Sequence, residues 1–168
     1  MAVPKYDEMY NDFLITLVDG KEHDIKEIRE IVAKKKKLTD EDLKETLHSG
    51  KCKYFNRIGW TATYLKKAGL INSVKRGMFN ITDEGNKIIT NNERIDNNFL
   101  LNYDSFKEFK DRNTEPIKIK EMNSSENEIE LTPQEKIEKA IQEINNEAAA
   151  MKYCHQLFIQ KLTQNGND

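Results

Sequence analysis

The sequence predicts a mainly helical protein with one small β-hairpin, an α+β fold that ends in a long C-terminal helix. Three observations support this prediction. Apolar residues recur at spacings of three and four over most of residues 1–90, which is typical of amphipathic helices. Two short runs of strand-forming residues flank a glycine-containing loop at 75–77, which indicates a hairpin. A further apolar pattern with helical spacing extends from Ile137 to Leu162.

Three helices are expected before residue 50. Apolar side chains recur on one helical face from Tyr6 to Val18, and Asp19-Gly20 is expected to end this helix. His23-Asp24 is expected to begin the second helix, and Thr39 to cap a short third one that ends at Ser49-Gly50. The buried stripe of the second helix would consist of Ile25, Ile28, Ile31 and Val32.

A fourth helix is expected from Tyr54 to Lys67, with Gly69 placed to end it. One face of this helix should pack into the core through Ile58, Thr61, Ala62, Leu65 and Ala68. A second face would carry Arg57, Trp60, Tyr64 and Lys67.

Two strands are then expected, at residues 70–74 and 78–82. Lys75-Arg76-Gly77 would form a three-residue hairpin loop, with glycine at the position that can adopt a positive φ. A last helix would begin at Asp83 and carry Ile88 and Ile89. The order of helix, helix, short helix, helix, hairpin and helix predicts a winged helix-turn-helix domain.

The chain is expected to have three parts: the winged-helix domain at 1–92, a linker at 93–130, and a long amphipathic helix at 131–168. The linker is polar except for a patch between Phe99 and Phe109, which is expected to form a helix that docks on the domain. Thr132, Pro133 and Glu135 form a strong helix start. The apolar face of the long helix needs a partner, which is another copy in a homodimer, the N-terminal domain, or a domain outside this chain.

Composition limits the location and chemistry of the protein. Cys52 and Cys154 are far apart and lack CxxC spacing, which argues against a disulfide framework or a zinc site and favours the cytoplasm. No apolar run is long enough to span a membrane, and the N-terminus lacks the apolar centre of a signal peptide.

Positive charge is concentrated in one segment. Residues 1–90 carry a net charge of +3 and residues 91–168 one of −5. The segment Ser49–Thr82 contains seven basic residues and no Asp or Glu. A basic helix followed by a basic hairpin predicts a surface for a polyanion, and double-stranded DNA is the expected partner.

Different roles are expected along this segment. Asn56 and Arg57 are candidates to contact base edges, and Thr63 to contact a base methyl group, because the helix from Tyr54 would lie in a groove. Asn56 would otherwise be a cap or turn residue. The remaining candidates are Lys51, Lys53, Lys66 and Lys67 for phosphates, Lys75 and Arg76 at the loop tip, and the amphipathic rings of Tyr54, Trp60 and Tyr64, of which Trp60 more often belongs to a core.

Catalytic and metal motifs are weak in this sequence. Asp42-Leu43-Lys44 and Asp104 with Glu108-Phe109-Lys110 match nuclease patterns by spelling, but both stretches are expected to be helical or irregular. Metal-dependent nucleases need such carboxylates on neighbouring strands, where they converge on one ion. The three histidines have no metal-binding spacing, and no glycine-rich phosphate loop is present.

The stretch SGKCKYFNRIGWTATYLKKAGLINSVKRGMFNITDEG at 49–85 resembles the N-terminal domain of Mrr-type restriction endonucleases, a bacterial family. The resemblance also covers VPKYDEMYNDFLITLVDG at 3–20. It resumes at LTPQEKIEKAIQEINNEAAA at 131–150, which is similar to the helix that joins this domain to the catalytic domain.

Full-length members of this family carry a C-terminal PD-(D/E)xK nuclease domain that uses a divalent metal and cuts modified (methylated) DNA. Residues 151–168 show no strand pattern with such residues. The resemblance therefore implies a DNA-binding specificity module that is not itself an enzyme, with Mg²⁺ needed only by the nuclease domain and no cofactor for this chain. The alternative function is a winged-helix transcriptional regulator or protein-interaction module that dimerises through its C-terminal helix.

Overall fold

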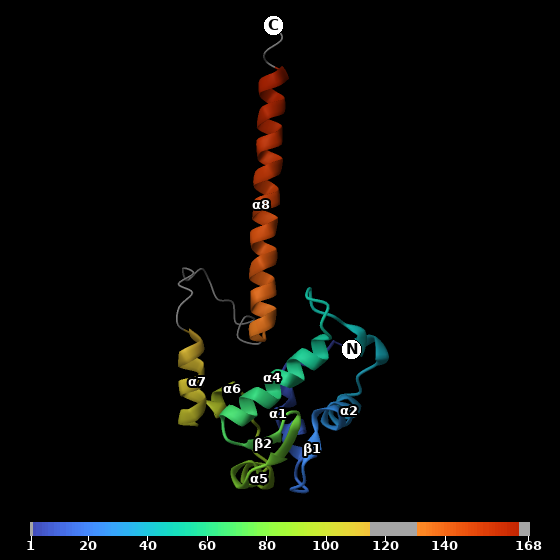
Figure 1. Ribbon diagram of the computed structural model, residues 1–168, viewed down its shortest axis with the longest axis vertical. Helices are drawn as coiled ribbons and strands as arrows, with labels where there is room; N and C mark the ends of the chain where they lie inside the picture. Colours follow the sequence, from blue (N-terminus) through green and yellow to red (C-terminus); the bar gives the residue numbers. More distant parts are fainter. Residues whose placement is uncertain (1, 115–130, 165–168) are drawn as a thin grey trace. The chain divides into compact units, whose positions relative to one another are not determined.

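The computed structural model describes residues 2–114 and 131–164, which belong to two compact units, Met1–Thr132 and Pro133–Asp168. The first unit combines short helices with a small antiparallel sheet, and the second is one long helix, α8 (Pro133–Gln164) (Figure 1). The predicted fold class, mainly α with a small β component and a long C-terminal helix, is confirmed.

The first predicted helix is present but shorter than expected. A 3₁₀ turn, η1 (Asp7–Met9), leads directly into α1 (Tyr10–Thr16). The chain leaves the helix at Leu17, so Val18 is 44% exposed instead of lying on the buried face. Tyr10, Phe13 and Leu14 are fully buried, as the apolar spacing predicted.

The segment after α1 differs from the sequence prediction. His23 and Asp24 form the short strand β1 (His23–Asp24), with His23 opposite Phe79 of a later strand, which the sequence did not predict. The expected start of the next helix at this pair is confirmed, because Asp24 is its N-cap. The Asp24 carboxylate accepts a hydrogen bond from the Lys26 backbone nitrogen at 2.7 Å and caps α2 (Ile25–Lys35). A two-residue strand has no periodicity, so only the sheet reveals it.

The third and fourth helices follow their predicted signals. Thr39 and Asp42 form a capping box at the start of α3 (Asp40–Lys44), which ends well before the expected Ser49-Gly50. A bridge between Thr46 and Cys52 then leads into α4 (Lys53–Lys67). The predicted inward face of α4 is confirmed: Ile58, Thr61, Ala62, Leu65 and Ala68 are all buried.

The hairpin is tighter than predicted. Its strands are β2 (Ile71–Lys75) and β3 (Met78–Ile81), and the sheet order is β1-β3-β2. Lys75 pairs with Met78 after a register shift, so the loop consists of Arg76 and Gly77 alone, rather than three residues. Gly77 has the predicted positive φ, at 81°.

Helices α5 (Asp83–Thr90), α6 (Asn97–Leu100) and α7 (Asp104–Thr114) complete the first unit. An added Cβ on Gly85 of α5 would lie 2.3 Å from the Leu70 backbone oxygen, so this close packing requires glycine. The rings of Phe106 and Phe109 on α7 pack against Tyr64 of α4. The predicted domain boundaries after residues 92 and 130 stay predictions. Residues 115–130 of the expected linker lie outside the described residues.

The core of the first unit lies where α1, α2, α4 and the sheet meet (Figure 1). Its largest fully buried side chains come from all of these elements and from α7: Met9, Tyr10, Phe13, Leu14, Leu17, Ile28, Tyr54, Ile58, Leu65, Leu70, Ile71 and Phe106. Burial of this apolar surface stabilises the folded state by about 25 cal/mol for each Å² removed from water. Helix α4 contacts α1, α3, α7 and β2, so only part of its surface remains accessible.

Candidate nucleic-acid interface

Five basic side chains of the segment Ser49–Thr82 are exposed to solvent: Lys51, Lys66, Lys67, Lys75 and Arg76. We call these five residues the basic set. No ion pair with a carboxylate involves any of them within residues 2–114 and 131–164. Lys53 differs because its ammonium group pairs with the Glu45 carboxylate. An exposed cation without a carboxylate partner retains its full attraction for a phosphate group.

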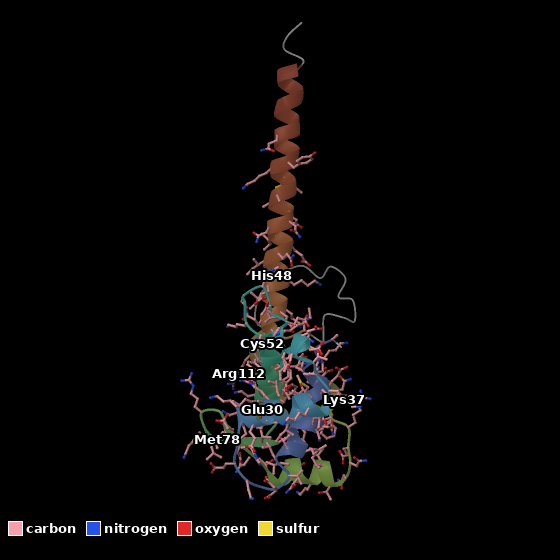
Figure 2. The ribbon with its side chains drawn as sticks, turned by 90° about the vertical axis from the view of Figure 1, so that its right-hand side faces the viewer. Glu30, Lys37, His48, Cys52, Met78 and Arg112 are labelled. Carbon is pink, nitrogen blue, oxygen red and sulfur yellow. The ribbon has the colours of Figure 1, made fainter. Side chains whose placement is uncertain are left out.

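The basic set extends along the length of α4. Lys51 precedes the helix, Lys66 and Lys67 lie in its last turn, and Lys75 and Arg76 lie at the hairpin tip. Figure 2 shows His48 and Cys52 well separated from Met78, which marks the hairpin. A helix of 15 residues is about 22 Å long at 1.5 Å per residue. The cations could therefore contact phosphates on both sides of a ligand held against α4.

Arg57 has a structural position instead of the expected base-reading one. Its side chain is only 7% exposed, and Nη1 donates hydrogen bonds to the backbone oxygens of Val3 at 2.7 Å and Pro4 at 3.2 Å. The N-terminal segment therefore covers this side of α4. Because the guanidinium group is held by the protein's own backbone, we do not retain Arg57 among the residues proposed to contact DNA.

Two of the aromatic candidates also belong to the core. The Tyr54 hydroxyl donates to the Arg29 backbone oxygen at 2.7 Å, and burial raises the pKa of Tyr54, so the hydroxyl stays protonated. Tyr64 is 8% exposed and its ring lies between those of Tyr6 and Phe106. Neither ring can reach a base in this arrangement. The reason is that α2 covers Tyr54, while Tyr6 and α7 cover Tyr64, on faces of α4 that the helical pattern left open.

Trp60 is half-buried, and its ring meets Tyr64 edge to face at a centroid distance of 5.7 Å. This position agrees with the expectation that a tryptophan more often contributes to packing. Lys67 lies beside the same aromatic group, with its ammonium nitrogen 5.2 Å from the centroid of the Phe109 ring. At this distance the ammonium group is attracted to the ring face, and the Lys67 side chain remains exposed.

The accessible side of α4 carries a different set of residues. Phe55, Gly59, Thr63 and Lys66 follow one another at intervals of four, four and three, and Asn56 flanks them. These spacings place them on one helical face, and none of the five is buried. We call Phe55, Asn56, Gly59, Thr63 and Lys66 the outer face of α4. Phe55 and Lys66 of this face are exposed, and Asn56, Gly59 and Thr63 are partly exposed.

The polar groups of the outer face already have local partners. The Thr63 hydroxyl donates to the Gly59 backbone oxygen at 3.0 Å, and Asn56 Oδ1 accepts a hydrogen bond from the Thr132 hydroxyl at 2.9 Å. The Asn56 amide nitrogen and the Thr63 methyl group remain as groups that could contact a ligand. These two residues fit the expected positions better than Arg57 does.

Phe55 was not singled out in the sequence. Its ring is 47% exposed, and the Arg29 guanidinium carbon of α2 lies 4.4 Å from the ring centroid. A hollow of about 310 Å³ beside it is lined by Lys51, Cys52, Phe55 and Asn56. Phe55 lies outside the inward face defined by Ile58, Leu65 and their neighbours, and this offset was the signal that could have identified it.

Gly59 was also missed. Its φ is not positive, and an added Cβ would meet no heavy atom within 4 Å, so neither backbone geometry nor packing requires glycine. Glycine within a helix costs about 0.5–1 kcal/mol relative to alanine. A glycine at the centre of the outer face leaves the helix backbone accessible to close approach by a ligand.

The two spelled nuclease motifs lie on helices α3 and α7. Asp42 is part of the capping box with Thr39, and Asp104 and Glu108 lie on the exposed surface of α7. Both stretches are helical, as expected. Within the part of the chain that the structure describes, no group of three or more His, Cys, Asp or Glu residues could hold a metal ion.

The comparisons with known proteins agree with the sequence resemblance. The family model described as the Mrr N-terminal domain matches residues 6–91, which include η1, the complete sheet, α4 and α5. No curated protein and no solved structure matches the chain. Among the described helices, none is long and apolar enough to cross a bilayer.

Proposed function

Because the chain belongs to the family of Mrr N-terminal domains, we propose that it is a restriction-related module that binds double-stranded DNA and reads its modification state. Residues 6–91 would act as a winged-helix domain, with α4 in the major groove and the β2–β3 hairpin as the wing. Such a module would act in the cytoplasm, on modified (methylated) DNA. The observation that carries the proposal is the basic set near the outer face of α4, whose five cations pair with no carboxylate among the described residues.

The basic set is proposed to position the domain on the duplex. Lysine and arginine contacts to phosphates release counterions and provide affinity without sequence information. Lys66 and Lys67 would contact phosphates at the C-terminal end of α4, and Lys51 at the other end. Arg76 at the hairpin tip has no carboxylate partner among the described residues and is suited to a minor groove, where a guanidinium group is attracted by the negative potential.

The outer face of α4 is proposed to read the bases. The Asn56 amide can contact a base edge, and the Phe55 ring and Thr63 methyl group can contact a base methyl group. A methyl group on cytosine occupies the same edge of the major groove as the thymine methyl group. Phe55 and Thr63 are therefore the residues on which a preference for methylated DNA would depend.

We propose no catalytic step for this chain. DNA cleavage would need clustered carboxylates and Mg²⁺ from another domain or another protein. Binding by this chain would accordingly need no cofactor and persist in excess EDTA.

The test is a binding titration with matched duplexes, one methylated and one not, at several salt concentrations. The proposal predicts that the duplex shifts at moderate salt, that EDTA has no effect, and that the combined change Phe55→Ala and Thr63→Ser reduces the preference for the methylated duplex. Lys87→Ala serves as the control, since Lys87 is an exposed lysine on α5 that pairs with Glu84 outside the basic set. No binding to either duplex at low salt would refute the proposal.

A second candidate function is a regulator or protein-interaction module that dimerises through α8. The observation that favours it is the row of exposed isoleucines on α8, at 137, 141 and 144, which are 53–64% exposed. Failure to bind DNA together with stable self-association would support this function over the first.

A further inference from the structure

The apolar residues of α8 follow a strict alternation of four and three. Ile137, Ile141, Ile144, Ala148 and Met151 are spaced 4-3-4-3, and all five are exposed or half-exposed on the described part of the helix. The next positions of this spacing are His155, Phe158 and Leu162, so the apolar pattern is interrupted at 155 and then resumes. This is the 3.5-residue repeat of a coiled coil, with Ile141 and Ala148 at a positions and Ile137, Ile144 and Met151 at d positions.

The stripe is narrow. The positions that flank the seam, e and g, carry Glu138, Asn145, Glu147 and Lys152, together with Ala140. A helix that packs on a globular domain usually has a wider apolar face, whereas a seam limited to a and d suits another helix with the same repeat. The exposed fractions of Ile144 at 64% and Met151 at 72% show how much apolar surface this seam leaves in water.

The charges beside the seam specify the partner and its direction. Glu147 occupies a g position and Lys152 the e position five residues later. In a parallel, in-register pair of helices, each g residue faces the e residue of the following heptad on the other helix. Glu147 of each copy would then face Lys152 of the other copy, twice by symmetry. In fully overlapped antiparallel registers g faces g, and Glu147 has no lysine opposite it.

We propose that α8 pairs with α8 of a second copy of this chain as a parallel, in-register, two-stranded coiled coil. The proposal is independent of DNA binding, because it concerns only the unit Pro133–Asp168. It would present two copies of the first unit in one assembly, as expected of a symmetric dimer.

The first measurement is the mass of the full chain by size-exclusion chromatography with light scattering. The expected mass is twice that of the 19.6 kDa chain. Ile144→Glu places charge in the seam and should give a monomer, while Asn146→Glu adds the same charge at the f position and should leave the dimer intact. A monomeric parent chain would overturn the proposal, and a trimer, which isoleucine at both a and d can favour, would overturn the two-stranded form.

A charge swap tests the direction. Glu147→Lys and Lys152→Glu should each weaken the dimer, roughly ten-fold in Kd, because two pairs of like charges then face each other. The double change should restore the parent affinity. Residues five apart on one helix do not face each other, so rescue must act between copies. No rescue would contradict the parallel register.

A disulfide provides a second test of direction. In a Cys52→Ser, Cys154→Ser background, Ile144→Cys should form a link between copies on mild oxidation, since the same d position meets itself only in the parallel, in-register pair. Absence of this link in a dimeric protein would overturn the register. Thermal unfolding of the first unit should be unchanged in each variant, which separates loss of pairing from loss of fold.

Discussion

Arg57 of α4 donates a hydrogen bond at 2.7 Å to the backbone oxygen of Val3, which lies 54 residues earlier in the chain. A second contact of the same kind joins the Thr61 hydroxyl to the Tyr6 backbone oxygen at 2.7 Å. Both groups are buried, so α4 holds the N-terminal segment through polar contacts as well as apolar packing. These contacts explain why Arg57 and Thr61, two polar residues of α4, are buried in the fold.

The substitution Arg57→Ala should therefore lower the stability of the first unit. Removing the guanidinium group leaves the Val3 oxygen buried without its donor, and hydrogen bonds to charged groups contribute about 1.5–3 kcal/mol. Urea unfolding should show a loss of about 2 kcal/mol at an unchanged m-value. DNA affinity of the folded protein should stay within two- to three-fold of the parent. A large loss of binding with normal stability would return Arg57 to the base-contacting set.

Lys66→Ala should weaken binding to all DNA sequences equally. Lys66 is exposed and lies on the outer face of α4, where it is proposed to contact a phosphate. Loss of one such contact lowers the slope of log K against log salt by about 0.9. Fluorescence anisotropy at four or more salt concentrations measures this slope. Lys87→Ala should leave the slope unchanged, and an unchanged slope for Lys66→Ala as well would exclude Lys66 from the interface.

Gly59→Gln should separate binding from stability. Glutamine is a better helix former than glycine, and nothing lies within 4 Å of an added Cβ, so the fold should become more stable by roughly 0.5–1 kcal/mol. The longer side chain would block close approach of DNA, and binding should fall at least ten-fold, about 1.4 kcal/mol. Unfolding curves and a binding titration on the same sample test both effects.

Gly85→Ala is the matched comparison. Its added Cβ would lie 2.3 Å from the Leu70 backbone oxygen, so this change should destabilise the first unit by a steric clash. If Gly59→Gln also destabilised the fold, or if it bound DNA as tightly as the parent, the assignment of Gly59 to a ligand-facing position would be wrong.

His23 should make stability depend on pH. Its ring hydrogen-bonds to Asp19 at 2.9 Å and to Glu27 at 3.0 Å, and the bond to Asp19 is the main cause that raises the pKa of His23 above its usual 6.5. The stabilisation is complete below pH 6.5 and is lost as the pH rises through the higher folded-state value. The same bond to His23 lowers the pKa of Asp19, so that contribution is present above about pH 4 and lost in acid.

His23→Gln should accordingly flatten the pH dependence of the unfolding free energy between pH 6 and 8. The parent protein should lose stability over this range, while the variant should change little. Urea unfolding at several pH values gives the comparison. Parallel curves for the two proteins would show that the His23 contacts do not contribute.

The helical order and the hairpin were predictable because they depend on local signals. Apolar spacing located α1, α2, α4 and α5, and Thr39, Gly69 and Gly77 marked boundaries through side-chain capping or positive φ. The strand β1 was not predictable, because two extended residues acquire their identity only by pairing with β3. The hairpin loop was also misjudged by one residue, since a register shift at Lys75 is a property of the paired strands.

The sequence by itself determined the fold class, the family resemblance and the concentration of positive charge in Ser49–Thr82. Charge and periodicity are local properties of the chain, so they do not depend on its tertiary contacts. The tertiary structure alone decided which of those residues are accessible. Arg57, Tyr54 and Tyr64 became buried because Val3, α2 and α7 come from distant parts of the sequence to cover them, and the same packing left Phe55 and Gly59 on the outer face.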